Sequence, residues 1–194
     1  SSFNSIAIQS DGKIVVGGNC WSCNGTSINH ILRLNGDGTM DVSFNPGTGF
    51  NNLVESLAIQ SDGKIIVGGG FTSFNGTTRS YIARLNTNGS LDNSFDPGSG
   101  FNTIVHSVVI QSDQKIVTGG EFTSFNGATR NSIIRLNTDG TADNSFDIGS
   151  GFDARVLSLT IQSDGKVISG GDFSAYNGTT RNGIARINTD GSLD

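Results

Sequence analysis

The sequence predicts an all-β protein, a β-propeller of four 51-residue blades with four strands in each. Three observations point to this fold: one segment returns at a constant spacing, each copy contains short strand-like patterns, and Asp-Gly and Asn-Gly turns separate those patterns. Glycine accounts for 28 of the 194 residues, well above the usual share of about 7%. This composition is typical of short strands joined by tight turns.

The repeat is strict. Ser-Ile-Ala-Ile-Gln at 5–9 returns with small changes at 56–60, 107–111 and 158–162. The copies therefore run approximately over 1–51, 52–102, 103–153 and 154–194, and we assign them to one domain over 1–194. Repeats of about this length are typical of solenoids, propellers and other arrays, in which each unit buries its faces against its neighbours.

The second copy shows the expected elements of a blade in order. Alternating or apolar runs predict four strands, and turn residues separate them. A polar segment, 71–79, is expected to form a loop between the second and third strands. The four expected strands lie at 56–60, 64–69, 81–86 and 90–95.

Four short strands in such a unit match the size of a propeller blade. A β-solenoid usually has a shorter rung, and a β-sandwich would not repeat at this spacing. The unit could also belong to a larger propeller or to an open repeat array. Two sets of phenylalanines are expected to fill the wedges between blades: Phe44, Phe95 and Phe146, and Phe50, Phe101 and Phe152.

The two ends of the chain resemble the two sides of an internal junction. Asp194 corresponds to Asp92, which a phenylalanine-containing linker follows, and 1–4 resembles a shortened form of that linker. We therefore expect the fourth copy to lead into the first, either in a closed ring or in a head-to-tail polymer.

Charge and hydropathy exclude two classes of partner. The net charge is -5, whereas nucleic-acid binding needs a basic face that neutralises phosphates. No apolar run approaches the roughly 18 residues that a membrane helix requires, so no membrane insertion is expected.

The repeated motif resembles a known family. Ile-Gln-Ser-Asp-Gly-Lys-Ile-x-Val-Gly-Gly is followed by Phe-x-Ser-Phe-Asn-Gly and by Ile-x-Arg-Leu-Asn-x-x-Gly-x-x-Asp-x-Ser-Phe. In copy two, residues 60–69, 74–76 and 82–95 carry this pattern. The pattern resembles the delta-60 repeat, which occurs in tandem in large bacterial surface or secreted proteins. The resemblance covers all four copies and implies a propeller-like fold and an extracellular or cell-surface location, but no activity. The Gly68-Gly69 pair also resembles kelch repeats.

Copy one differs from the others at two cysteines. Cys20 and Cys23 stand where copy two has Phe71 and Phe74. We expect a local disulfide that staples this loop, consistent with an oxidising compartment. A redox motif and half of a metal site are the alternatives.

The turn before the last strand of copy one offers oxygen ligands at alternate positions. Asn35, Asp37 and Asp41 are therefore calcium candidates, although Arg33 occupies the place of the expected first ligand. The alternative is a glycine turn whose aspartate caps the backbone. No other cofactor is expected.

Charged residues recur at fixed positions in every copy. A domain rarely needs one catalytic site four times, so we expect these residues to tie blades together. They are Asp11, Asp62, Asp113 and Asp164; Lys13, Lys64, Lys115 and Lys166; and Arg33, Arg84, Arg135 and Arg186.

Positions that vary between copies do not define the blade and are candidates for facing a ligand. Unselected surface variation explains them equally well. The candidates are Asn19, Glu121, Asp172, His30 and Tyr81.

These observations favour a noncatalytic extracellular or cell-surface module that acts in structure, adhesion or self-assembly, with a filament subunit as its most specific form. Its expected partners are its own copies, another surface protein or a glycan. One alternative is a lectin-like propeller that binds carbohydrate through aromatic-amide pairs such as Phe74-Asn75, Phe125-Asn126 and Tyr176-Asn177. A second alternative is an enzyme, such as a hydrolase, with a site at the propeller axis, although no catalytic set is visible.

Overall fold

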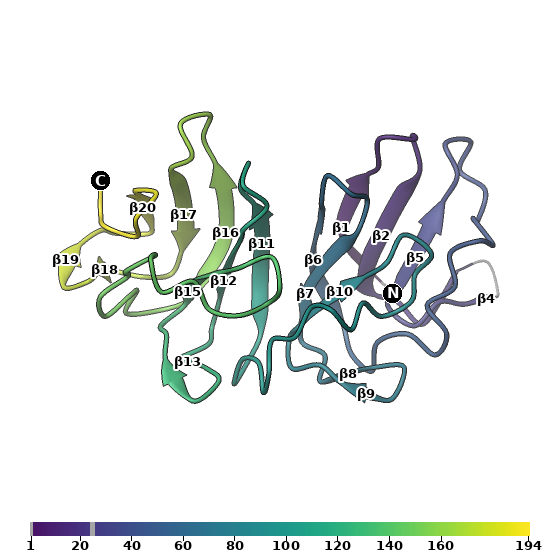
Figure 1. The fold of residues 1–194 in the computed structure, drawn as a ribbon, viewed down its shortest axis with the longest axis horizontal. Helices are drawn as coiled ribbons and strands as arrows, with labels where there is room; N and C mark the ends of the chain where they lie inside the picture. Colours follow the sequence, from purple (N-terminus) through teal and green to yellow (C-terminus); the bar gives the residue numbers. More distant parts are fainter. Residues whose placement is uncertain (1, 24–25) are drawn as a thin grey trace.

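A computed structural model describes residues 2–23 and 26–194. It shows an all-β propeller whose four blades follow one another in chain order (Figure 1). The first and fourth blades lie at opposite ends of this row, with the purple and yellow ends of the chain far apart. Within the described residues, no helix has the length and apolar character that crossing a membrane requires.

Each blade is built on a three-stranded antiparallel sheet with its middle strand second in sequence. Alternating side chains place apolar residues on both faces, so the second and third sheets are buried between two neighbours, whereas the first and fourth are each covered on one face. The strands are β1 (Ser2–Ile8), β2 (Ile14–Asn19) and β5 (Ile31–Leu34); β6 (Val54–Ile59), β7 (Ile65–Gly69) and β10 (Ile82–Leu85); β11 (Val105–Ile110), β12 (Ile116–Gly120) and β15 (Ile133–Leu136); β16 (Val156–Ile161), β17 (Val167–Gly171) and β20 (Ile184–Ile187).

The polar segment expected to be a loop folds into a small hairpin instead. In the second blade its turn residues Asn75 and Gly76 both have positive φ, 50° and 79°, as a tight hairpin of the Asn-Gly kind requires. The hairpins are β3 (Ser22–Cys23) with β4 (Thr26–Ser27), β8 (Ser73–Phe74) with β9 (Thr77–Thr78), β13 (Ser124–Phe125) with β14 (Ala128–Thr129), and β18 (Ala175–Tyr176) with β19 (Thr179–Thr180).

The fourth strand expected in each blade is reduced to a single bridge. In the second blade only Leu85 and Leu91 pair. The carboxylate of Asp92 then accepts hydrogen bonds from the backbone N–H and the hydroxyl of Ser94. This local turn takes the chain away from the sheet before a strand over 90–95 can form.

The hydrophobic cores lie between blades. The core between the first two blades combines Val15 and Ile31 with Leu57 and Val67, and the next two junctions repeat this arrangement. The expected wedge position of the phenylalanines is confirmed: Phe44, Phe50, Phe95, Phe101, Phe146 and Phe152 are all buried in these junction cores.

Candidate functional site

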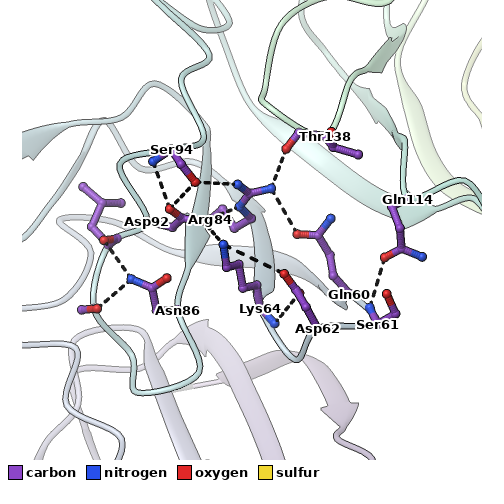
Figure 2. A network of polar contacts seen from close by, with 12 residues as sticks. Gln60, Ser61, Asp62, Lys64, Arg84, Asn86, Asp92, Ser94, Gln114 and Thr138 are labelled. Carbon is purple, nitrogen blue, oxygen red and sulfur yellow. Dashed lines mark hydrogen bonds and ion pairs between the residues drawn. The ribbon is translucent and has the colours of Figure 1, made fainter.

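A buried polar network connects each blade to the next (Figure 2). Arg84 donates from Nε to Oδ2 of Asp92 at 2.7 Å, and from Nη1 to the carbonyl of Thr138 in the following blade at 2.5 Å. Lys64 contacts the same Asp92 oxygen at 2.9 Å. The guanidinium also lies 5.1 Å from the ring centre of Phe95, within cation–π range. The predicted blade-to-blade tie is thus confirmed for Arg33, Arg84 and Arg135, whereas Arg186 pairs with Asp194 of its own blade.

The two other charged columns have local roles. Lys64 pairs with Asp92 of its own blade. Asp62 accepts a hydrogen bond from the backbone N–H of Lys64 and caps the β6–β7 turn. The prediction that these residues tie blades together is therefore wrong for both columns. The carboxylates of Asp11, Asp62, Asp113 and Asp164 serve the turns in which they lie, and Lys13, Lys64, Lys115 and Lys166 each pair with an aspartate of their own blade.

The network keeps its central carboxylates ionised. The hydroxyl of Ser43 and the ammonium of Lys13 hold the pKa of Asp41 well below its usual value. Burial raises the pKa of Asp92, but hydrogen bonds from Ser94 and Lys64 outweigh it, so the net shift is downward. The charged groups of this network therefore use their hydrogen bonds and ion pairs on one another.

Two smaller features complete each junction. The hydroxyl of Ser56 accepts the backbone N–H of Val108 from the next blade at 3.1 Å. Gly68 provides the seat for that blade, because a Cβ there would lie 2.7 Å from Cγ1 of Val105 and 2.9 Å from Cγ1 of Val108. Glycine is therefore required by close approach of the neighbouring side chains.

The last blade presents this same surface to solvent. Ile184 is 64% exposed, whereas its counterparts Ile31, Ile82 and Ile133 are completely buried. The Arg186 side chain is 48% exposed, against 8% for Arg84. A Cβ on Gly170 would meet nothing nearer than a carbonyl oxygen at 3.9 Å. We call Ser158, Gly170, Ile184 and Arg186 the outgoing face.

The first blade presents the complementary surface. Ile6 is 66% exposed, whereas its counterpart Leu57 is 8% exposed. Phe3 is 46% exposed and occupies the place of the buried Val54. Ile8 is exposed beside them. We call Phe3, Ile6 and Ile8 the incoming face.

A charged cleft of about 540 Å³ lies between the third and fourth blades. Arg155 is at its centre: Nε donates to Oδ2 of Asp172 at 2.5 Å, and Nη1 donates to Oε1 of Glu121 at 3.1 Å. Nε2 of His106 lies 3.2 Å from the same Glu121 oxygen. The pKa of Glu121 is lowered, first by the hydrogen bond with His106 and then by that with Arg155.

A β-bulge positions the histidine. The register of β11 against β12 shifts between Val105 and Ser107, so His106 is the extra residue. A bulge re-aims the side chain that it carries, and here the side chain reaches Glu121.

The structure brings together two of the five predicted ligand-facing residues, Glu121 and Asp172, and separates the others. Asn19 lies in the first blade, opposite Ser2. His30 is buried against Trp21, and Tyr81 is half-buried. The prediction that His30 faces a ligand is wrong, because its side chain is 1% exposed and packs against Trp21.

The calcium candidates do not converge on one point. Oδ1 of Asp37 accepts the backbone N–H and hydroxyl of Thr39, so this aspartate caps the turn. Asn35 donates to the Thr39 hydroxyl. Asp41 is held by Arg33 and Lys13. Among the described residues, no group of three or more His, Cys, Asp or Glu side chains is placed to hold a metal ion.

Cys20 and Cys23 are free thiols in the structure, which does not contain the expected disulfide. The buried Cys20 directs its sulfur to the carbonyl of Ser22 at 3.1 Å. The aromatic-amide pairs proposed for a lectin are also unsuited to stacking on a sugar, because Phe74, Phe125 and Tyr176 are at most 2% exposed.

Comparison with protein families gives one match that recurs in every copy. The model described as a domain of unknown function (DUF5122) beta-propeller matches residues 9–44, 60–95, 111–146 and 162–194. A search of curated proteins gives no match.

Solved structures share the fold at low sequence identity. The extracellular domain assigned to a one-component system of B. thetaiotaomicron is 16% identical, with a TM-score of 0.54 over 98% of this chain and 21% of that one. The WD40 β-propeller domain of Doa1 is 16% identical, with a TM-score of 0.59 over 88% of this chain and 48% of that one. The extracellular domain assigned to a hybrid two-component system of B. thetaiotaomicron is 11% identical, with a TM-score of 0.54 over 99% and 22%. This chain thus spans less than half the length of each of these proteins.

Proposed function

The chain belongs to the DUF5122 β-propeller family, and we propose that this member is a noncatalytic extracellular or cell-surface module that associates head to tail with further copies of itself. The observation that carries this proposal is the pair of end faces. The outgoing face repeats, residue by residue, the surface that seats the next blade inside the chain. The incoming face has apolar side chains at the positions of the surface that is seated, with Phe3 where the other copies have valine.

The internal junctions supply the template for the docked state. In it, the N–H of Ile6 from a second copy would donate to the hydroxyl of Ser158, as Leu57 donates to Ser5. Arg186 would gain a backbone carbonyl from that copy, as Arg33 gains that of Thr87. Burying Ile6 and Ile184 adds the apolar area that drives association.

Two further considerations support a noncatalytic role and an extracellular location. The repeated charged residues are bound to one another in structural networks, which favours a noncatalytic role. Two of the similar structures are described as extracellular domains, which agrees with the surface or secreted location that the delta-60 resemblance implies.

A contact between two different faces allows a complementation test. Sedimentation velocity over a range of concentrations should show the 20.2 kDa chain forming dimers and longer species. Ile6→Asp and Ile184→Asp should each remain monomeric. A mixture of the two should form a dimer and stop there, because each variant retains one intact face of opposite kind.

Val42→Asp is the matched control. Val42 is 91% exposed, and its counterparts Asn93 and Asn144 stay exposed beside internal junctions, so docking would not cover it. This variant should associate like the parent. A parent chain that is strictly monomeric at high concentration, or a mixture of variants that stays monomeric, would overturn head-to-tail association.

A further inference from the structure

The charged cleft occupies a position that the preceding junction fills with an apolar side chain. Ile104 is the counterpart of Arg155, and its Cδ1 lies 3.8 Å from where a Cβ on Gly70 would be. Gly70 is the counterpart of Glu121. The junction between the third and fourth blades therefore has an open polar cleft where the preceding junction has an isoleucine against a glycine. Arg155 and Glu121 are not needed to build a blade.

The polar atoms in the cleft are only partly used. Arg155 uses Nε and Nη1, Glu121 uses Oε1, and Asp172 uses Oδ2. Within 2–23 and 26–194, the structure gives no hydrogen-bond partner to Nη2 of Arg155, Oε2 of Glu121 or Oδ1 of Asp172. One charged donor and two charged acceptors thus remain available in one cleft, on side chains that the existing pairs hold in place.

The charge of the cleft selects the kind of ligand. Three carboxylates, those of Glu121, Asp153 and Asp172, line it with the single guanidinium of Arg155. An anion would be repelled by this excess of negative charge. A cation would meet Arg155 at the centre, between the two carboxylates that it already neutralises. A neutral ligand with several hydroxyl groups avoids both the repulsion by the carboxylates and the repulsion by Arg155.

Hydroxyl groups also match the free atoms. Each hydroxyl both donates and accepts, so adjacent hydroxyls can donate to the carboxylates while accepting from Nη2 of Arg155. The volume of about 540 Å³ is within the range of small-molecule sites. We propose that this cleft binds a neutral sugar, through Glu121, Arg155 and Asp172 acting as a set.

The experiment is a screen of the whole chain on an array of neutral and acidic oligosaccharides, followed by calorimetric titration with the best neutral sugar. Arg155→Ile and Glu121→Gly introduce the residues that the preceding junction carries, so the fold accepts them. Each should weaken sugar binding at least tenfold. Arg130→Ile, which removes an arginine outside the cleft lining, should bind like the parent.

Three outcomes would overturn the proposal: no neutral sugar binds at millimolar concentration, acidic sugars alone bind, or the Arg155 and Glu121 variants bind like the parent. Thermal unfolding of each variant checks that a lost signal is not lost folding. The proposal is independent of head-to-tail association, because the Ile184→Asp variant should bind the sugar unchanged.

Discussion

The hydroxyl of Ser5 accepts the backbone N–H of Leu57 at 3.0 Å, across the junction between the first two blades. The same contact recurs between Ser56 and Val108 and between Ser107 and Leu159. The second, third and fourth blades thus each donate a backbone N–H of their first strand to the preceding blade. A fixed polar contact of this kind sets how one blade is seated on the next.

Removing this hydroxyl should destabilise the chain only at an internal junction. Ser107 is buried and accepts the Leu159 N–H at 3.1 Å. Ser107→Ala leaves that donor without a partner, so we expect a loss of about 1–3 kcal/mol in the free energy of unfolding, measured by denaturant titration. Ser158→Ala is the control: its hydroxyl is on the exposed outgoing face, and the monomer should unfold as the parent does.

Removing the arginine of the polar network should also lower the free energy of unfolding more at an internal junction than in the last blade. Arg84 and Asp92 have side chains that are each 8% exposed. Arg84→Ala leaves the Asp92 carboxylate buried with one cation fewer, and such truncations cost about 3–5 kcal/mol. Arg186→Ala removes a half-exposed counterpart, so we expect less than about 1 kcal/mol. Equal losses in the two variants would contradict the role of Arg84 as a tie between blades.

Acid should weaken the fold through the network aspartates. The folded state lowers the pKa of Asp41, chiefly through the Ser43 hydroxyl and then through Lys13. A lowered pKa contributes stability that is fully present above the unfolded value of about 3.9 and is lost as pH falls toward the folded value. The free energy of unfolding should therefore decrease below about pH 4. Asp41→Asn should be less stable at pH 7 and should show a flatter dependence on pH.

The repeat made the blade predictable, because each strand recurs with its turns and its alternating pattern. Two details of the blade could not be predicted from the repeat pattern. The segment 90–95 has the alternation of a strand, but hydrogen bonds from Ser94 to the Asp92 carboxylate turn the chain away from the sheet. The segment 71–79 has the polarity of a loop, and its Asn-Gly turn nevertheless closes a hairpin.

The candidate site was only partly predictable. Glu121 and Asp172 were found because they vary between copies, and His30 was selected by the same rule although its side chain is buried. Variation alone does not distinguish a side chain that faces solvent from one that packs inside the blade, as His30 does against Trp21. Arg155 is not among the predicted residues, and the signal for it is a charge in a column that otherwise holds Ser2, Leu53 and Ile104.

The glycine that contacts the neighbouring blade is crowded at the internal junctions and open to solvent in the last blade. At Gly68 a Cβ would lie 2.7 Å from Val105, and crowding of this kind in a packed core costs about 1–3 kcal/mol. Gly68→Ala should therefore lower the midpoint of thermal unfolding. At Gly170 the same Cβ meets nothing nearer than 3.9 Å, so Gly170→Ala should unfold at the parent temperature or slightly above it.

In head-to-tail association, however, the incoming face of a second copy would bring Phe3 against Gly170. Gly170→Ala should then reduce the dimer seen in sedimentation while leaving the monomer stable, and a variant that associates as strongly as the parent would show that this glycine is not the seat.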